Sequence, residues 1–571
     1  CLHVRPLVNT KSPAGVNQMA AIADGVTDLV VEYGGSVSGE HGDGRARTQW
    51  NRKLYGDHVW GVFRDLKTAF DPDWLLNPGQ VCGYADSEEL PPRAPERANA
   101  VDMTEHLRFD PDYEFDAGFD PTLAWQNENG FQGMVELCHG CGGCRGGQET
   151  TGGVMCPTYR AADEEITSTR GRANMLRQAM SGDWGTAAAP DDEQFDVEFM
   201  HEVMDLCIGC KGCARDCPSE VDMAKLKAEV EHEHHQRNGA SVRDQLFASV
   251  ETLSSVGSTL APLSNWADRV PGARTVMEWT LGIARERPLP TFHEESLEDW
   301  FAARGGSAVP ENEADRRVVL FPDTYTNYNH PDAGKAAVKV LEAAGVHVRI
   351  PADVDASGRP AYSKGFLDVA RRRARTNVDA LAPHVRDGWD VVVVEPSDAV
   401  MFQSDYLDLL SGGHEVQRQT DPGSDAGRVD QRGAVDRVAA NTYGVCEYLD
   451  AFDLAADLGA DARESLTYHG HCHQKATKKD GHAVAVLREA GYAVDELDSG
   501  CCGMAGSFGY EAEHYSMSKA IGEILFEQVE ESDGDSVVAP GASCRTQLGD
   551  RDGASAEPPH PVEKLADALT E

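Results

Sequence analysis

Two runs of closely spaced cysteines constrain this chain more than any other feature of its sequence. Eight of the fifteen cysteines form two C-x2-C-x2-C triplets and two Cys-Pro pairs, namely Cys138, Cys141, Cys144, Cys156, Cys207, Cys210, Cys213 and Cys217. Three thiolates at this spacing on a Gly-containing loop can bind most of one iron–sulfur cube, and a distant Cys-Pro supplies the fourth ligand. The pattern therefore predicts two [4Fe–4S] clusters.

The fourth ligand of each cluster is expected to come from the other run, as two-cluster arrangements require. The two predicted ligand sets are Cys138, Cys141, Cys144 with Cys217, and Cys207, Cys210, Cys213 with Cys156. The alternative is a pair of zinc sites. Zinc usually takes two C-x2-C pairs, so a third cysteine three residues further on exceeds what a tetrahedral ion needs.

The charge of the chain limits its partners and its surroundings. With 52 Lys and Arg against 95 Asp and Glu, the net charge of the 571 residues is −43, which excludes a nucleic-acid partner held by phosphate neutralisation. Such an acidic coat is tolerated where concentrated salt screens it. We expect a cytoplasmic protein of a halophile, specifically a haloarchaeon, and the alternative is an ordinary acidic protein.

Cysteine usage and hydropathy bear on location. Clustered spacings favour metal binding in a reducing compartment over disulfides. No run of about 18 apolar residues is present, so no transmembrane segment is predicted, and membrane contact would be peripheral, at the inner face. The chain begins at Cys1 within an apparent strand, so we expect it to be part of a longer protein.

The first 83 residues are predicted to combine a strand at 29–33 with a helix near 60–70. Between them lies the Gly-rich loop 34–44, in which Glu40 stands beside His41. Read alone, such a loop is more often structural than catalytic. A phosphate-binding role is excluded because no Gly-Lys-Ser/Thr follows.

Three motifs in this region resemble the C-terminal domain of FAD-linked oxidases of the D-lactate, glycolate and D-2-hydroxyglutarate dehydrogenase group. They are His3-Val4-Arg5-Pro6, Ser38-Gly39-Glu40-His41-Gly42-Asp43-Gly44 and Leu76-Asn77-Pro78-Gly79. The resemblance implies that His3 and Glu40 ligate a divalent metal at the substrate and that His41 is the base. It also implies a catalytic role for Arg5 and a cofactor-binding role for Asn77, with most of the FAD held by a domain outside this sequence.

The rest of the chain is predicted to hold five further parts. Residues 84–130 are an acidic linker, 131–245 the two-cluster ferredoxin-like domain, and 246–310 a helical connection. Two copies of an α/β unit follow, at 311–440 and 441–571. Their predicted strands are 318–321, 346–350 and 391–394 in the first copy, and 465–468, 492–494 and 537–539 in the second. The fold class is multidomain, α+β and α/β.

The second copy carries its own cysteines, Cys472, Cys501, Cys502 and Cys544. Cysteines that follow successive parallel strands converge at one edge of the sheet. Residues 465–571 resemble the Cys-Cys-Gly domain of heterodisulfide-reductase-type and anaerobic glycerol-3-phosphate dehydrogenase electron-transfer subunits, which implies a third, unusual iron–sulfur cluster. Zinc and free or redox-active thiols are the open alternatives.

The first copy departs from this pattern and is expected to be a structural remnant. Ala356 and Ser357 stand where the paired cysteines would be, and Asp398 replaces a third. Outside these motifs, Cys1, Cys82 and Cys446 are expected to be buried thiols.

Together the resemblances imply a fused FAD and iron–sulfur D-2-hydroxyacid dehydrogenase, with D-lactate favoured over glycolate and D-2-hydroxyglutarate. Electrons would pass from the flavin through the clusters to a quinone, a cytochrome or another soluble protein, and a homodimer is compatible with the sequence. The alternative is a non-catalytic electron-transfer subunit. Residues 1–83 discriminate, because a pure carrier has no use for a Glu-His loop of this kind.

Overall fold

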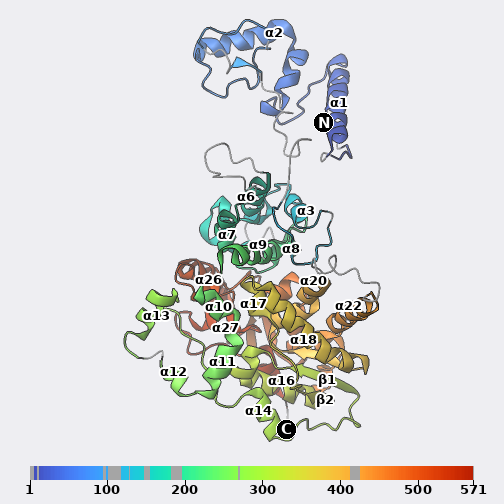
Figure 1. Ribbon diagram of the computed structural model, residues 1–571, viewed down its shortest axis with the longest axis vertical. Helices are drawn as coiled ribbons and strands as arrows, with labels where there is room; N and C mark the ends of the chain where they lie inside the picture. Colours follow the sequence, from blue (N-terminus) through green and yellow to red (C-terminus); the bar gives the residue numbers. More distant parts are fainter. Residues whose placement is uncertain are drawn as a thin grey trace. The chain divides into compact units, whose positions relative to one another are not determined.

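The computed structural model describes residues 6–9, 12–85, 87–93, 98–100, 117–127, 129–146, 155–181, 196–267, 270–411 and 425–569. The chain divides into two units, residues 1–114 and residues 115–571 (Figure 1). The division separates the region that resembles a flavin oxidase from the cysteine-rich remainder. No helix among the described residues is long and apolar enough to cross a membrane.

The first unit is built on two long helices, α1 (Pro13–Glu32) and α2 (Thr48–Phe70). The predicted strand at 29–33 is wrong, because these residues form the last turn of α1 and its C-cap. Two features stabilise the start of the helix. Ser12 accepts a hydrogen bond from the Gly15 amide at 3.1 Å, and Pro13 occupies the first helical position. Cooperative propagation then carries the helix through its β-branched residues.

A small core joins α2 to the residues that follow it. It consists of the buried residues Trp60, Trp74, Cys82 and Ala98. The Arg64 guanidinium lies 4.5 Å from the ring centre of Tyr84, which also pairs with Asn99. The start of the predicted linker 84–130 therefore packs against this unit. Cys82 is a buried thiol, as expected.

The cluster-binding part of the second unit is helical. Its helices are α3 (Gly130–Glu136), α5 (Pro157–Ala162), α6 (Thr169–Ser181), α7 (Val197–Asp205), α8 (Gly212–Asp216) and α9 (Met223–Asn238). The buried carboxylate of Glu229 on α9 accepts hydrogen bonds from the backbone amides of Thr122 and Leu123 at 2.9 and 2.6 Å. The end of the predicted linker is thus fastened to α9.

The Glu-His run of α9, residues 231–235, alternates in charge, a pattern that by itself indicates a solvated helix face, but the structure buries its first two residues. Glu231 and His232 are 6% and 9% exposed. His232 Nδ1 lies 3.0 Å from the Gly365 carbonyl and His235 Nε2 lies 2.9 Å from the Lys364 carbonyl. The face is buried because a later part of the chain covers it, which periodicity on one helix cannot show.

Five helices connect this part to the α/β repeats. They are α10 (Val242–Ala248), α11 (Val250–Thr259), α12 (Leu263–Ala267), α13 (Ala273–Leu281) and α14 (Leu297–Ala303). Ser241 and Ser296 cap α10 and α14 through their hydroxyl oxygens. The helical connection predicted for residues 246–310 is consistent with these elements.

The first repeat contains a four-stranded parallel sheet in the order β2-β1-β3-β4. Its strands are β1 (Arg316–Phe321), β2 (Val346–Arg349), β3 (Asp390–Val393) and β4 (Thr442–Gly444). Strand β4 pairs with β3, so this sheet extends beyond residue 440, where the sequence suggested that the first repeat ends. The accompanying helical elements are α15 (Thr324–Tyr328), α16 (Pro331–Ala343), α17 (Arg359–Ser363), α18 (Leu367–Arg386), α19 (Pro396–Val400), the π-helix Met401–Asp405, α20 (Tyr406–Ser411) and α22 (Asp425–Ala440).

The second repeat contains a three-stranded parallel sheet in the order β6-β5-β7. Its strands are β5 (Ser465–Tyr468), β6 (Ala493–Glu496) and β7 (Ser536–Val538). Its helices are α23 (Val445–Ala451), α24 (Cys472–Ala476), α25 (Gly481–Glu489), α26 (Tyr515–Glu531), α27 (Ala542–Gly549) and α28 (Pro561–Ala568).

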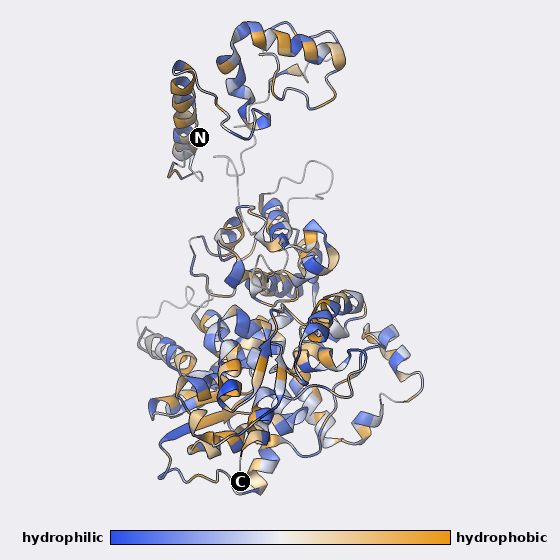
Figure 2. Ribbon diagram, turned by 180° about the vertical axis from the view of Figure 1, so that it is seen from behind, coloured by the Kyte–Doolittle hydropathy of each residue, from blue (hydrophilic) through white to orange (hydrophobic). Residues whose placement is uncertain are grey.

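One hydrophobic core joins the two repeats. Leu320 and Val392 of the first sheet lie in the same buried cluster as Leu466 and Val538 of the second. The strands at the centre of this unit are coloured as hydrophobic in Figure 2. Burial on both faces is typical of parallel sheets, and it explains why these strands appear in the sequence as continuous apolar runs. Cys446 lies in this core, and burial raises its pKa to about 12.

Charged groups join the cluster-binding part to the repeats. Asp405, which is fully buried, receives Lys211 Nζ at 2.7 Å and Arg359 at 2.6 Å on its two carboxylate oxygens. His514 bridges Asp205 at 2.7 Å and Glu511 at 3.0 Å. Buried ion pairs of this kind hold their partners in one arrangement, because removal of one member leaves an unpaired buried charge.

The His514 bridge predicts a pH-dependent stability. Burial alone would lower the pKa of His514, but its hydrogen bonds to Asp205 and Glu511 outweigh burial and raise the pKa to about 9. Because this folded-state pKa exceeds the unfolded value of about 6.5, the stabilisation is complete below pH 6.5 and is lost as the pH rises through 9. The loss is up to about 3 kcal/mol.

Urea unfolding under anaerobic conditions at several pH values measures this loss. His514→Gln should flatten the decline in unfolding free energy above pH 7. The control His293→Gln, at an exposed histidine of the same unit, should keep the decline. A decline that is equal in both variants would assign it to other groups.

Candidate metal centres

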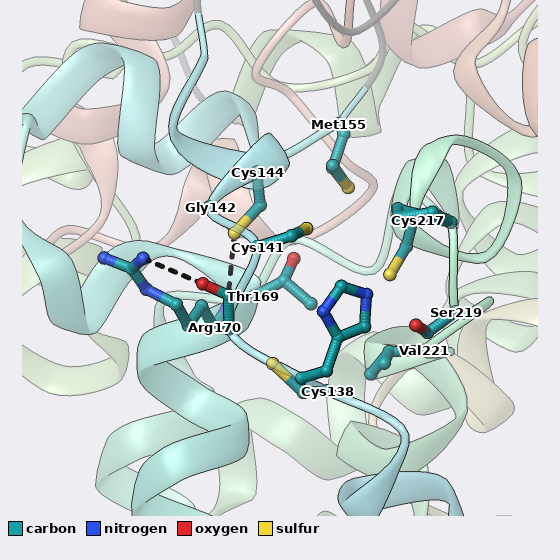
Figure 3. A pocket seen from close by; sticks show the side chains of 13 residues that line it. Cys138, Cys141, Gly142, Cys144, Met155, Thr169, Arg170, Cys217, Ser219 and Val221 are labelled. Carbon is teal, nitrogen blue, oxygen red and sulfur yellow. Dashed lines mark hydrogen bonds between the residues drawn. The ribbon is translucent and has the colours of Figure 1, made fainter. Parts of the chain in front are cut away.

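The first cysteine triplet and Cys217 surround one pocket. Its lining includes Cys138, Cys141, Cys144 and Cys217 (Figure 3). The first three come from the loop after α3, and Cys217 comes from the end of α8, 73 residues beyond Cys144. The structure therefore brings Cys217 to the triplet that lies further away in sequence, as the exchanged pairing requires.

The loop around this pocket is shaped by glycine and held by one arginine. Gly140 and Gly142 have φ values of 79° and 80°, a region that glycine enters without steric cost. The backbone amide of Arg170 donates to Cys144 Sγ at 3.4 Å, while its guanidinium binds both carboxylate oxygens of Glu165 at 2.7 and 2.8 Å. An amide directed at sulfur stabilises a thiolate ligand and tunes the metal that it binds.

The second triplet begins on the loop after α7, and its last cysteine, Cys213, lies in the first turn of α8. Cys210 and Cys213 are buried, and the Met223 amide donates to Cys213 Sγ at 3.4 Å. Burial, the largest cause, raises the pKa of both thiols well above the ordinary value. Thiolates in such a place need a bound cation to balance their charge, which fits iron ligation.

Cys156 lies between the two triplets. It has a left-handed backbone with φ 55° and begins α5, with Pro157 as the first helical residue. Its thiol interacts electrostatically with Cys144 of the first triplet and with Cys213 of the second. It does not line the first pocket.

The third group of cysteines lies where the strands of the second sheet end. Cys501 and Cys502 follow β6, Cys544 lies on α27 after β7, and Cys472 begins α24 after β5. Cys501 hydrogen bonds with Cys472 and Cys502, and Cys502 hydrogen bonds with Cys544. Hydrogen bonds to Cys501 and Cys544 lower the pKa of Cys502 well below its ordinary value. The four predicted thiols thus form one buried group.

The second and third groups are in contact. Cys210 belongs to one buried cluster with Cys472 and Cys501. Two further contacts support this junction: Arg215 donates to the Lys475 carbonyl at 2.6 Å, and His473 Nε2 lies 3.1 Å from the Gly209 carbonyl. The edge of the second sheet therefore faces the second triplet directly.

One residue of the third group escaped the sequence analysis. His469 follows β5 directly, is fully buried, and lies with a ring nitrogen within 4.8 Å of the sulfur atoms of Cys502 and Cys544. Its position three residues before Cys472, at the end of a predicted strand, was the available signal. The sequence has two further histidines here, His471 and His473, which flank that cysteine.

The corresponding edge of the first repeat carries carboxylates in place of thiols. Asp323, Glu395 and Asp398 are buried, and Ser357 Oγ donates to Asp398 at 2.5 Å. Burial and then Asp323 raise the pKa of Glu395 to about 7. These oxygens offer iron no thiolate, in agreement with the loss of cysteine seen in the sequence.

The predicted catalytic residues of the first unit are not assembled into an enclosed site. His41 Nε2 lies 3.3 Å from Glu40 Oε1, with both side chains at least half exposed. Asn77 is exposed and has φ 45°. His3 and Arg5 lie outside the described residues, so their predicted roles are untested.

Comparison with protein families identifies three domains. Residues 1–81 match the C-terminal domain of FAD linked oxidases, residues 134–221 match the 4Fe-4S dicluster domain, and residues 466–549 match the cysteine-rich domain. These domains indicate iron–sulfur and FAD chemistry. The dicluster match includes all eight cysteines of the first two groups, and the cysteine-rich match includes all four of the third.

Relatives show the same combination. The D-2-hydroxyglutarate dehydrogenase of Haemophilus influenzae is 25% identical over 610 residues, which cover 100% of this chain and 55% of the relative. The chain thus spans about half the length of the relatives that it matches throughout. One subunit of the Escherichia coli anaerobic glycerol-3-phosphate dehydrogenase is 28% identical over 67% of this chain and 91% of its own length. The iron–sulfur subunit of the glycolate oxidase from the same organism is 22% identical over 73% of this chain and 90% of its own length.

The chain therefore joins the C-terminal domain of an FAD-linked oxidase to a 4Fe–4S dicluster domain and a cysteine-rich domain, and its homologues are dehydrogenases and iron–sulfur subunits of this kind.

Proposed function

We propose that this chain is part of an FAD- and iron–sulfur-dependent dehydrogenase that oxidises a D-2-hydroxy acid. The observation that carries the proposal is the contact of Cys210 with Cys472 and Cys501. It supports an electron route from the dicluster domain into the second repeat. Such a route is needed when a flavin that accepts two electrons together must deliver them singly to an acceptor.

In this proposal the electron route has three stations, by which we mean three metal centres held by described residues. Cys138, Cys141, Cys144 and Cys217 hold the first cluster, and Cys207, Cys210, Cys213 and Cys156 hold the second. Cys156 is near both triplets, so the two clusters are neighbours. The third station is the cysteine group of the second repeat, which the proposal assigns to a third iron–sulfur centre.

The first unit supplies groups that act on the substrate. His41 would take the hydroxyl proton of the hydroxy acid at a ring nitrogen, and Glu40 with His3 would hold a divalent metal at the same oxygen. When bound, FAD supplies the hydride acceptor. The exposure of the Glu40–His41 loop, and of Leu66, Phe70 and Leu76 at 56–85%, supports completion of this unit by a flavin-binding domain.

The names of the relatives that align with the whole of this chain support D-2-hydroxyglutarate as the substrate, ahead of the D-lactate that the sequence motifs favoured. Glycolate is the smaller member of the same class. The acceptor in this proposal is a quinone, a cytochrome or a soluble redox protein. The acidic composition supports work in a salt-rich cytoplasm, and a quinone acceptor would place the protein at the inner face of the membrane.

The second candidate is a non-catalytic electron-transfer subunit. The match to a subunit of anaerobic glycerol-3-phosphate dehydrogenase favours it, because that match covers 91% of the relative. The match of residues 1–81 to a flavin-oxidase domain favours the enzyme. We prefer the enzyme because the alignment with D-2-hydroxyglutarate dehydrogenases extends over the whole chain.

Ligand exchange between the two cysteine runs is testable in this chain alone. Cys156→Ala should damage the cluster of Cys207, Cys210 and Cys213, although Cys156 is nearer in sequence to the other run. The matched variant Cys217→Ala should damage the cluster of Cys138, Cys141 and Cys144. Electron paramagnetic resonance spectra of the separately reduced clusters distinguish them, and the opposite assignment would refute the exchange.

Catalysis is testable in a protein that joins this chain to the flavin-binding half. His41→Asn should leave metal content unchanged and slow flavin reduction by about 10²–10⁴-fold, the usual contribution of a general base. Glu40→Gln should lower metal occupancy. His58→Asn, at an exposed histidine of α2, is the matched control.

Stopped-flow reduction with D-2-hydroxyglutarate, D-lactate and glycolate gives the substrate order, with D-2-hydroxyglutarate expected to be fastest. If flavin reduction is unchanged in the His41 variant, His41 has no part in the mechanism. If none of the three acids reduces the flavin, the electron-transfer subunit becomes the better account.

A further inference from the structure

Each strand of the second sheet places one metal-binding atom at its carboxyl end. His469 follows β5, Cys502 follows β6, and Cys544 follows β7. A ring nitrogen of His469 and the two sulfur atoms all lie within 4.8 Å of one another. The three residues are 0%, 3% and 1% exposed. Among the described residues they form the one group of this kind, and the edge of a parallel sheet is where such folds bind ligands.

A hydrogen bond at Nδ1 fixes the orientation of the His469 imidazole. Its Nδ1 lies 2.6 Å from Ser499 Oγ, and Ser499 is itself buried. Lys475 Nζ donates to the carbonyl of Ser499 at 2.6 Å and to its hydroxyl oxygen at 3.3 Å. With the lysine donating to that oxygen, Ser499 Oγ has a second lone pair for the Nδ1–H of His469. This tautomer leaves a lone pair on Nε2.

His469 Nε2 is buried and forms no hydrogen bond of ordinary geometry. On this side the imidazole interacts with the thiol of Cys502, which is itself a candidate metal ligand. An imidazole whose far nitrogen is fixed by a hydrogen bond, and whose near nitrogen points at two cysteines, has the arrangement of a metal-ligating histidine.

We propose that His469 Nε2 is a ligand of the metal centre in the second repeat, together with Cys502 and Cys544. This deepens the proposed function and rests on it, because it assigns a ligand to the third station of the electron route. The other two cysteines of the group have a different position: Cys472 and Cys501 contact Cys210 of the second cluster. The thiolates of Cys472 and Cys501 therefore face the second cluster, from which electrons arrive, and the imidazole of His469 lies on the inner side of the centre.

A histidine ligand gives this centre a distinct role. A neutral imidazole adds a ligand without adding negative charge, whereas a thiolate at position 469 would add one and lower the potential of the centre. The two ferredoxin-type ligand sets consist of cysteine alone. Electrons are therefore expected to collect at the second repeat, which makes it the exit of the chain. His469 and Ser499 set this potential, one as ligand and one as positioning residue.

The test uses the full chain purified anaerobically, unlabelled and with ¹⁵N-histidine. The wild type should contain about twelve irons, four for each of three centres, and electron–nuclear double resonance should show histidine nitrogen coupled to the centre of highest potential. His469→Cys should retain the iron, lose the nitrogen coupling and lower that potential. His469→Gln should lose the coupling, with or without loss of iron from this centre.

The matched control is His482→Gln. His482 lies on α25 with Nδ1 2.5 Å from Asp450 Oδ2, outside the donor group of His469. This variant should keep both the coupling and the potential.

Two outcomes would contradict the inference, and they have different consequences for the proposed function. Twelve irons without nitrogen coupling in the wild type would show that His469 is no ligand, while the third station of the proposed function stands. Eight irons in the wild type, unchanged by Cys501→Ser with Cys502→Ser, would show that the second repeat holds no iron–sulfur centre. That result would remove the third station as well.

Discussion

The contact of Cys210 with Cys472 and Cys501 is the point on which the rest of this structure depends. It brings a cysteine of the dicluster domain against the cysteine group of the second repeat. The contacts around it hold that junction in place, above all the buried Asp405 between Lys211 and Arg359. Desolvation of these charges offsets much of their attraction, so we interpret the triad as a device that fixes position.

The two repeats have different roles at this junction. The second repeat keeps its thiols, whereas the first has carboxylates at the corresponding sheet edge and offers iron no sulfur. The first repeat nevertheless contributes Arg359 and Asp405 to the charged triad and shares its core with the second. It therefore acts as the support on which the dicluster domain is mounted.

Much of the fold and of the donor groups could be predicted from the sequence, because the signals are local. The Cys-x2-Cys spacing fixes which thiols share a loop, and the strands β1 and β3 contain apolar runs because both faces of a parallel sheet are buried. The exchange of Cys217 to the distant triplet followed from the paired Cys-Pro pattern. The pocket that contains Cys217 agrees with that pairing.

The remaining features depend on contacts between distant segments. The β-branched residues at the end of α1 favour a strand locally, but the helix that starts at the Ser12 cap extends through them. The alternating charges of α9 indicate a solvated face. Nothing in that sequence pattern shows that residues 364 and 365 cover this face in the fold. His469 is a candidate donor only because the fold places the ends of three strands side by side.

Magnetic coupling between the reduced centres tests the central claim most directly. The account places the Cys207 cluster against the centre of the second repeat, and the Cys138 cluster on the far side of Cys156. Electron paramagnetic resonance of the fully reduced chain should therefore show spin–spin splitting between the second and third centres, and Cys501→Ser with Cys502→Ser should abolish it. Three reduced centres whose signals are a simple sum, without splitting between the second and the third, would contradict the electron route proposed here.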